Sequence, residues 1–366
     1  MSSGATREGT ARYAERFRGI AAEGHFRQVA GITMSSLGIG TYLGPPNDST
    51  DSSYTAAIVA AVESGINLVD TAINYRLQRS ERSVGTALKV LARKGISRDE
   101  IVVCTKGGYL TPDGSMPSDP NRYFFEEYVQ KGVLSAKDIA AGCHCLTARF
   151  LENQLNRSLK NLQLDAIDVY YLHNPETQLA EIRSEDFLLR VREAFVLLES
   201  AVRRGQIQFY GLATWNGFRQ EKAVRDAMQL GDIAAIAKQV AGEKHSFRFV
   251  QLPFNLAMTE ALTLGNQLVP SGLRTMMEAA DELGIHLIAS ASLLQGQVAQ
   301  NLPSFVADAL GLHDDAERAL QFARSAPGIS AALVGMSRTA HVEANARLVE
   351  TPSAGLDQFS RLFSPP

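Results

Sequence analysis

The sequence has few cysteines and no long apolar run, and each absence excludes a class of protein. Only three cysteines occur among 366 residues, at Cys104, Cys143 and Cys145. An odd and low number excludes a disulfide framework and is typical of a reducing compartment. No apolar run approaches the roughly 18 residues of a membrane helix. The first 25 residues also lack the apolar core of a signal peptide. We therefore expect a cytoplasmic protein without membrane contact.

An excess of charge of one sign is also missing. The formal net charge is −3, and basic and acidic residues are scattered along the chain, so nucleic acid is not an expected partner. No GxGxxG turn follows the first apolar run, which excludes the simplest dinucleotide-binding fold. No His-x-His ends that run either, which argues against a metal-dependent barrel hydrolase.

The segment Cys143-His144-Cys145 is the one stretch that looks like a metal-binding motif. Neighbouring residues on a strand point to opposite sides, so these three side chains cannot easily bind one ion. We expect ordinary packing here, with contact between His144 or Cys145 and a ligand as the alternative. No metal site is predicted.

What the chain does contain is a repeated alternation of short apolar runs and amphipathic segments. The runs predict strands over 36–40, 66–70, 101–106, 166–173, 208–214, 247–251, 285–290 and 331–335. The segments between them predict helices over 53–64, 80–93, 147–162, 185–204, 219–230, 275–283, 315–324 and 341–348. Eight strand–helix units predict an α/β fold, a closed (β/α)8 TIM barrel. Gly65, Gly95, Gly205 and Gly284 each follow a predicted helix, at the position of a left-handed cap.

Three stretches lie outside this regular pattern. We expect a polar N-terminal extension over 1–25 and a single barrel domain over 26–366. The connection 107–146 greatly exceeds the roughly 2–6 residues usual for such loops. Its aromatic residues predict a lid over the barrel mouth, with a surface subdomain as the alternative: Tyr123, Phe124, Phe125 and Tyr128. The stretch 231–246 predicts an added helix at the amino-terminal face, structural or interfacial.

Ionisable residues end three of the predicted strands. Asp70, Lys106 and His173 close the second, third and fourth runs, and Tyr75 follows Asp70 by five residues. In a barrel, the carboxyl ends of the strands converge on one mouth. These four side chains are therefore expected to lie together, with Thr214, Gln251 and Ser290 from later strands.

This set suits proton transfer to a carbonyl oxygen. A phenol has a pKa near 10 in water, and a nearby ammonium paired with a carboxylate lowers that pKa. A neutral histidine can orient the substrate oxygen. We therefore expect Tyr75 to act as general acid in carbonyl reduction, or as general base in alcohol oxidation, with hydride supplied by a cofactor.

Several motifs resemble those of the aldo-keto reductase superfamily over about residues 27–348. They are Asp-Thr-Ala-x-x-Tyr at 70–75, the Ser-Glu-x-x-x-Gly-x-Ala-Leu helix at 80–88, Thr-Lys at 105–106, Ser-Leu-x-x-Leu at 158–162 and the strand that ends in Leu172-His173. The resemblance implies a barrel closed below by a hairpin at 27–34. It also implies a catalytic set of Asp70, Tyr75, Lys106 and His173, and NADPH, with NADH also possible, bound without a Rossmann domain.

The resemblance also implies which residues bind the cofactor. They are Gly40 and Thr41 at the end of the first strand, Thr214, Gln251 and Ser290 around the nicotinamide end, and Gly335, Ser337, Arg338 and Asn345 around the adenosine end. Three positions depart from the family pattern. Ala213 and Thr214 replace a serine and an asparagine that hydrogen-bond the nicotinamide carboxamide, and of the two only Thr214 can still offer a bond. Ser290 replaces the aromatic ring on which the nicotinamide stacks.

The leading hypothesis is thus an NADPH-dependent oxidoreductase acting on a small, partly apolar carbonyl or alcohol, and no particular oligomeric state is indicated. Two alternatives on the same barrel stay open. One is a nucleotide-binding regulatory protein, which the altered nicotinamide contacts favour. The other is a lyase or isomerase that uses Tyr75, Lys106 and His173 without redox chemistry.

Overall fold

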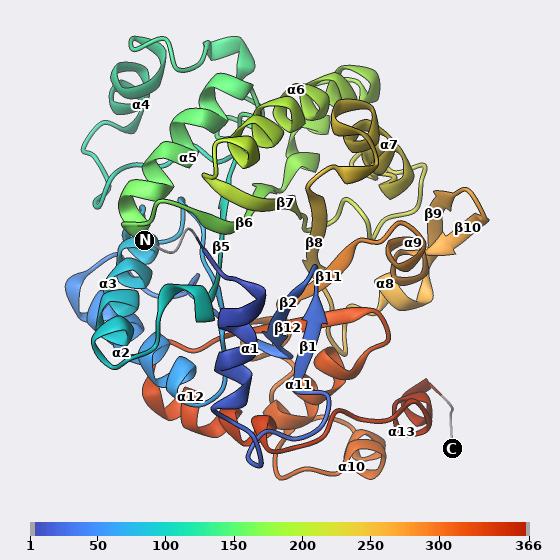
Figure 1. Cartoon of the computed structure of the whole chain (residues 1–366). Helices are drawn as coiled ribbons and strands as arrows, with labels where there is room; N and C mark the ends of the chain where they lie inside the picture. Colours follow the sequence, from blue (N-terminus) through green and yellow to red (C-terminus); the bar gives the residue numbers. More distant parts are fainter. Residues whose placement is uncertain (1–3, 364–366) are drawn as a thin grey trace.

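Eight parallel strands close into a barrel surrounded by helices in the computed structural model, which describes residues 4–363 (Figure 1). In chain order they are β3 (Leu37–Gly40), β4 (Leu68–Asp70), β5 (Val102–Gly107), β6 (Ile167–His173), β7 (Ile207–Ala213), β8 (Phe247–Pro253), β11 (His286–Ser290) and β12 (Ile329–Gly335). The last strand, β12, pairs with the first, β3, in parallel. All eight predicted strands are present, so the predicted (β/α)8 barrel is confirmed.

The barrel strands are largely apolar because both of their faces are buried. In β6, Val169 and Tyr171 belong to the cluster inside the barrel. Tyr170 and Leu172 belong to the layer between the strands and the helices. Alternate side chains of one apolar run therefore point into two different cores, one inside the barrel and one beneath the helices.

The helices around the barrel are α2 (Asp48–Glu63), α3 (Arg79–Arg93), α5 (Ala148–Leu162), α6 (Ser184–Arg203), α7 (Leu230–Ala241), α9 (Met276–Glu282), α11 (Asp315–Ser325) and α12 (Thr339–Ala346). Seven of them match predicted helices, with small shifts at the ends. All four predicted cap glycines have positive φ, from 65° at Gly284 to 97° at Gly65. None of the helices among residues 4–363 is long and apolar enough to span a membrane.

The helix predicted over 219–230 is wrong. Residues 219–229 form turns, and the helix of this unit, α7, begins at Leu230. Gly231 lies in the first turn of α7, where an added Cβ would come within 2.5 Å of the Leu268 carbonyl oxygen. The glycine thus allows a close approach between α7 and strand β9 (Gly265–Val269). The added helix that was predicted within 231–246 is therefore α7, the regular helix of this strand–helix unit.

The N-terminal part of the chain closes the lower end of the barrel. Strands β1 (Phe26–Val29) and β2 (Ile32–Ser35) form an antiparallel hairpin, and Val29, Ile32 and Met34 join the cluster inside the barrel. The expected hairpin plug is confirmed. Helix α1 (Arg7–Glu15) crosses this end in Figure 1, with Tyr13 fully buried and its hydroxyl donating to the Val62 carbonyl at 2.5 Å.

Residues 1–3 of the predicted 1–25 extension and 364–366 of the predicted barrel domain lie outside the described part of the chain. Additional short elements decorate the barrel: α4 (Pro120–Phe124), α8 (Glu260–Thr263), the hairpin of β9 with β10 (Gly272–Thr275), α10 (Ser304–Leu310) and α13 (Leu356–Ser360). Figure 1 places α4, within the long insert, on the outside of the molecule beyond α5.

Candidate active site

A cavity of about 730 Å³ opens at the carboxyl ends of the barrel strands. Its lining includes three of the predicted catalytic residues, Asp70, Tyr75 and His173. Lys106, the fourth, is fully buried and bonded to two of them. The convergence expected from the strand ends is therefore found.

Lys106 joins the carboxylate and the phenol. Its Nζ lies 2.6 Å from Asp70 Oδ2 and 3.2 Å from the Tyr75 hydroxyl, and it donates to the Thr71 carbonyl oxygen at 2.8 Å. These three acceptors use the three donors of an ammonium. The predicted salt bridge, with the lysine nitrogen beside the tyrosine oxygen, is confirmed.

Burial and charge set the protonation states of this pair. Burial disfavours the charge on Lys106, but attraction by Asp70 and then by Tyr75 outweighs it, so the pKa of Lys106 is raised. Burial also raises the pKa of Tyr75, and Lys106 opposes this rise without reversing it. The expected net lowering of the Tyr75 pKa is therefore wrong. The phenol instead keeps its proton at neutral pH, which a proton donor requires.

His173 is held as a neutral imidazole. Burial, followed by repulsion from Lys106, lowers the pKa of His173 well below its usual value. Its Nδ1 lies 3.2 Å from Asn74 Oδ1, and its ring meets that of Tyr75 edge-on with centroids 5.7 Å apart. Asn74 therefore fixes the ring orientation and decides which ring nitrogen carries the proton.

The Cys143-His144-Cys145 segment packs behind His173. The Nε2 of His144 lies 2.7 Å from the His173 carbonyl oxygen, and its Nδ1 lies 2.8 Å from the Gln178 amide nitrogen. Cys143 is exposed and Cys145 is buried near Thr147. The three side chains meet different partners, so the segment supports the backbone of His173.

Most of the predicted cofactor residues line the same cavity: Gly40, Thr41, Thr214, Gln251, Ser290, Gly335 and Asn345. Ser337 and Arg338 do not line it. Arg338 is exposed and precedes α12, which contributes the lining residues His341 and Asn345. Gln251 donates to Asp70 Oδ1 at 2.8 Å. The side-chain oxygens of Thr214 and Ser292 are buried without a partner within the described structure.

The insert does not cover the cavity with its aromatic residues. Tyr128 is fully buried against Phe150 of α5, with ring centroids 5.6 Å apart, and donates to the Thr111 carbonyl. None of the four aromatic residues predicted to form the lid lines the cavity; only Tyr109, at the start of the insert, does so. The lid interpretation is wrong for these aromatics: Phe124 and Tyr128 pack in a small core with Phe150 of α5, and Phe125 is exposed.

Sequence reasoning missed several residues that line the cavity, namely Tyr42, Leu43, Asn74, Tyr109, Asn174, Trp215 and the loop 291–296. Trp215 is the single tryptophan of the chain and directly follows Thr214. Tyr109 stands three residues after Lys106. These residues could have been predicted from their positions directly after the strand ends, because residues just beyond each barrel strand also reach the mouth.

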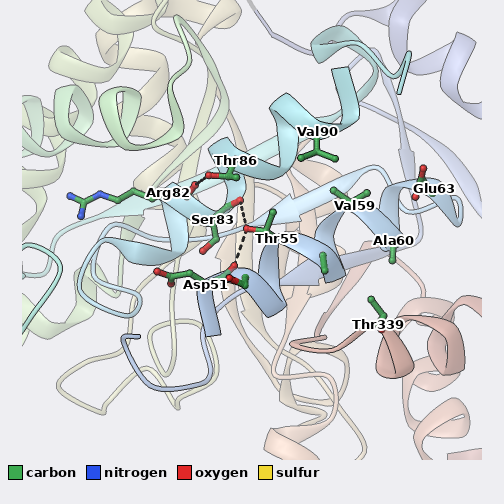
Figure 2. A pocket seen from close by; sticks show the side chains of 12 residues that line it. Asp51, Thr55, Val59, Ala60, Glu63, Arg82, Ser83, Thr86, Val90 and Thr339 are labelled. Carbon is green, nitrogen blue, oxygen red and sulfur yellow. Dashed lines mark hydrogen bonds between the residues drawn. The ribbon is translucent and has the colours of Figure 1, made fainter. Parts of the chain in front are cut away.

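A second, more open groove lies outside the barrel between α2 and α3, with Thr339 nearby (Figure 2). Its polar groups already have partners: the Thr55 hydroxyl donates to the Asp51 carbonyl at 2.8 Å, and the Thr86 hydroxyl donates to the Arg82 carbonyl at 2.9 Å. The Asp51 and Glu63 carboxylates pair with cations outside the groove. None of the predicted site residues lines it, so the candidate site is the cavity at the barrel mouth.

The barrel and its mouth define a (β/α)8 protein with its candidate chemistry at the carboxyl ends of the strands. Comparison with protein families matches residues 36–362 to the aldo/keto reductase family. The chain belongs to that family.

Solved structures share the fold at low sequence identity. The holo form of an aldo-keto reductase from Bacillus halodurans has a TM-score of 0.63 and 19% identity, over 92% of this chain and 95% of that one. An aldo-keto reductase from Klebsiella pneumoniae, in complex with NADP and acetate, has a TM-score of 0.61 and 18% identity, over 94% and 97%. A thermostable aldo-keto reductase bound to the inhibitor epalrestat has a TM-score of 0.62 and 16% identity, over 92% and 98%.

Proposed function

We propose that this protein is an NADPH-dependent oxidoreductase that interconverts a carbonyl and an alcohol on a small, partly apolar substrate, with Tyr75 as the general acid and base. The observation that carries the proposal is the buried Lys106, whose Nζ joins Asp70 at 2.6 Å and the Tyr75 hydroxyl at 3.2 Å. Family membership supports the reaction class. The Klebsiella pneumoniae neighbour solved with NADPH supports the choice of cofactor.

The residues at the mouth fit an extended dinucleotide. The cavity runs from Tyr75 and His173 to Asn345 of α12, and the buried hydroxyls of Thr214 and Ser292 offer it two unused polar groups. Thr214, Gln251 and Ser290 would hold the nicotinamide end. Gly335, Ser337, Arg338 and Asn345 would hold the adenosine end, and Gly40 and Thr41 lie at the first strand end between them.

When bound, NADPH supplies hydride, and the chain's own residues manage the proton. The Nδ1–H of the neutral His173 donates to Asn74 Oδ1, so its Nε2 can accept from the hydroxyl of an alcohol and thereby orient the substrate oxygen. Tyr75 gives its proton to that oxygen as negative charge develops there. Lys106 then stabilises the resulting phenolate, since an ammonium at 3.2 Å in a buried site favours the charged form. Alcohol oxidation uses the same groups in reverse.

The walls around this proton donor favour a ring-bearing carbonyl substrate. Tyr42, Leu43, Tyr109 and Trp215 all line the cavity. The Tyr109 ring lies edge-on to His173, with centroids 5.1 Å apart. Flat apolar substrates bury area against such rings. The proposal of a partly apolar substrate thus depends on these wall residues and not on the four aromatic residues at 123–128.

Fluorescence titration with NADPH and NADH tests the cofactor assignment. Ala213 and Ser290 lack a hydrogen-bond donor and a stacking ring, each equivalent to about 0.5–1.5 kcal/mol. We expect Ala213→Ser and Ser290→Tyr each to tighten NADPH by roughly 2- to 13-fold. If neither changes the affinity, the nicotinamide lies elsewhere. If neither nucleotide binds, a lyase or isomerase reaction at the same residues becomes the better account.

A further inference from the structure

Glu176 is a buried carboxylate between two parts of the cavity wall. It lies in a short 3-10 helix, Pro175–Ala180, three residues beyond His173, and is 5% exposed. Its Oε1 accepts three successive backbone N–H groups, those of Trp215, Asn216 and Gly217, at 2.6, 3.0 and 3.3 Å. Its Oε2 is buried and has no partner within the described structure.

The three amides belong to the turn that carries Trp215 into the cavity. Trp215 lines the cavity and is 43% exposed, so packing alone does not fix its place. The turn is also held at its outer side by Arg219, which donates to the Trp215 carbonyl at 3.2 Å and pairs with Glu260 at 2.9 Å. The Asn216 side chain also donates to Asp226 at 3.2 Å, and the Gly217 carbonyl accepts from the Met228 amide at 2.6 Å. Among these contacts, Glu176 is the buried carboxylate that holds three successive amides of the turn.

Asn174, directly before this short helix, fixes another part of the cavity wall. Asn174 has a left-handed backbone, with φ of 44°, and its side chain donates to the Tyr109 hydroxyl at 3.0 Å. Its backbone N–H donates to the Ala213 carbonyl at 2.6 Å. Residues 173–176 thus set the imidazole, the Tyr109 ring and the Trp215 turn relative to one another.

We propose that Glu176 is a positioning residue that holds Trp215 as one wall of the substrate pocket, and that Trp215 thereby sets the preference for ring-bearing over small aliphatic carbonyls. Burying a carboxylate costs free energy unless it is hydrogen-bonded. Here three backbone amides donate to one carboxylate oxygen, and together they hold the turn more firmly than a single hydrogen bond to a neutral acceptor would. This proposal rests on the proposed function for its substrate part only.

The test uses Trp215 itself, because the single tryptophan of the chain reports the turn without any catalysis. In Glu176→Ala we expect red-shifted emission and easier quenching by acrylamide. Glu176→Gln keeps an acceptor oxygen at the same reach and should restore the wild-type emission. Glu176→Asp, whose carboxylate is one methylene shorter, should behave like the alanine variant and serves if that variant does not fold.

With NADPH saturating, Glu176→Ala and Trp215→Leu should each raise KM for an aromatic aldehyde about tenfold relative to KM for a short aliphatic aldehyde. The change in kcat should be smaller. The matched control is Glu199→Ala, which removes another carboxylate that is 5% exposed and that binds Tyr210 and the Ser246 amide instead. It should lower stability without changing the emission or the ratio of KM values.

Unchanged emission and quenching in a folded Glu176→Ala protein would overturn the proposal, as would the same changes in Glu199→Ala. An unchanged KM ratio in Trp215→Leu would overturn its substrate part. Failure of the wild type to oxidise NADPH with any aldehyde would instead contradict the proposed function, while the emission data would still decide whether Glu176 holds Trp215.

Discussion

The ring of Tyr75 packs against other aromatic rings, and a phenylalanine at this position would keep those contacts and lack only the hydroxyl. Its ring lies edge-on to those of Tyr42 and His173, at centroid distances of 5.0 and 5.7 Å. Tyr75→Phe therefore keeps the packing and removes the proton. We expect turnover to fall by about 10²-fold or more, with little change in NADPH affinity, measured by steady-state kinetics and titration.

Tyr42→Phe is the matched control for this substitution. Tyr42 is a neighbouring phenol at the same mouth but is 55% exposed and has no hydrogen bond to Lys106 in the structure. It should keep most of its turnover. Full turnover in Tyr75→Phe would eliminate Tyr75 as the general acid.

Two buried histidines make stability depend on pH. Burial lowers the pKa values of His25 and His144 to about 4, whereas an unfolded histidine has a pKa near 6.5. Between these values the unfolded chain binds protons that the folded chain does not, so stability is present above about pH 6.5 and is lost as pH falls towards 4. At about pH 5 each histidine should reduce the free energy of unfolding by roughly 2 kcal/mol.

Urea unfolding at about pH 7.5 and pH 5 measures this loss. His144→Gln should show a smaller loss than the wild type, because one of the buried titrating histidines is gone. His313→Gln, at an exposed position, should lose as much as the wild type. An equal loss in all three proteins would mean that the buried histidines do not cause it.

At the residue scale, the positions of the candidate catalytic residues could be predicted from the sequence, but their burial and hydrogen-bond partners could not. Asp70, Lys106 and His173 were found because strand ends converge whatever the details of packing. The direction of the Tyr75 pKa shift was missed because the depth of burial is not visible in a sequence. Glu176 was missed because its partners are backbone amides some forty residues away, which leave no pattern in residue types.

At the scale of elements, the insert 107–146 divides into a part at the mouth and a part on the outside. Tyr109 lines the cavity, whereas Tyr128 packs on Phe150 and lies 5.3 Å beneath the Arg157 guanidinium. Tyr128→Ala should therefore cost about 3–5 kcal/mol of packing energy and leave the KM values unchanged. Tyr109→Leu should raise KM for aromatic aldehydes with little loss of stability.

Thermal unfolding together with KM measurements on both variants separates the two roles. If Tyr128→Ala raised KM for large substrates as much as Tyr109→Leu does, the outer part of the insert would be acting as a lid after all.

Elements with a regular apolar period were predictable, and those fixed by tertiary contacts were not. The strands follow from short apolar runs, and seven helices follow from an apolar period of 3.6 residues. The helix at 219–230 was predicted as an amphipathic segment between strands, but residues 219–229 form turns held by tertiary contacts such as that of Arg219 with Glu260. In the structure, Gly231 is required by the close approach of β9. The β9–β10 hairpin was missed because its Leu268 and Leu273 are exposed, at 53% and 59%, and do not alternate like a buried strand.

At the scale of the whole molecule, the two ends of the barrel have separate tasks. The lower end is sealed by the hairpin and by the segment before it, where Asp168 accepts the Ala5 amide at 2.6 Å and the Val103 amide at 2.6 Å. The upper end carries the cavity. The number of strand–helix units was visible in the sequence, but the shape of the cavity was not, because loops from most of the strands build it. The domain boundary at residue 26 stays a prediction.

The most direct test of the central claim is the stoichiometry of nicotinamide oxidation against alcohol formation from an aromatic aldehyde. It should be measured with the wild type and with Lys106→Met in the same assay. We predict one NADPH oxidised for each alcohol formed by the wild type, and a Lys106→Met protein that binds NADPH but reacts about 10²-fold more slowly or worse. NADPH bound without oxidation, or a carbonyl compound converted without consumption of NADPH, would contradict the account.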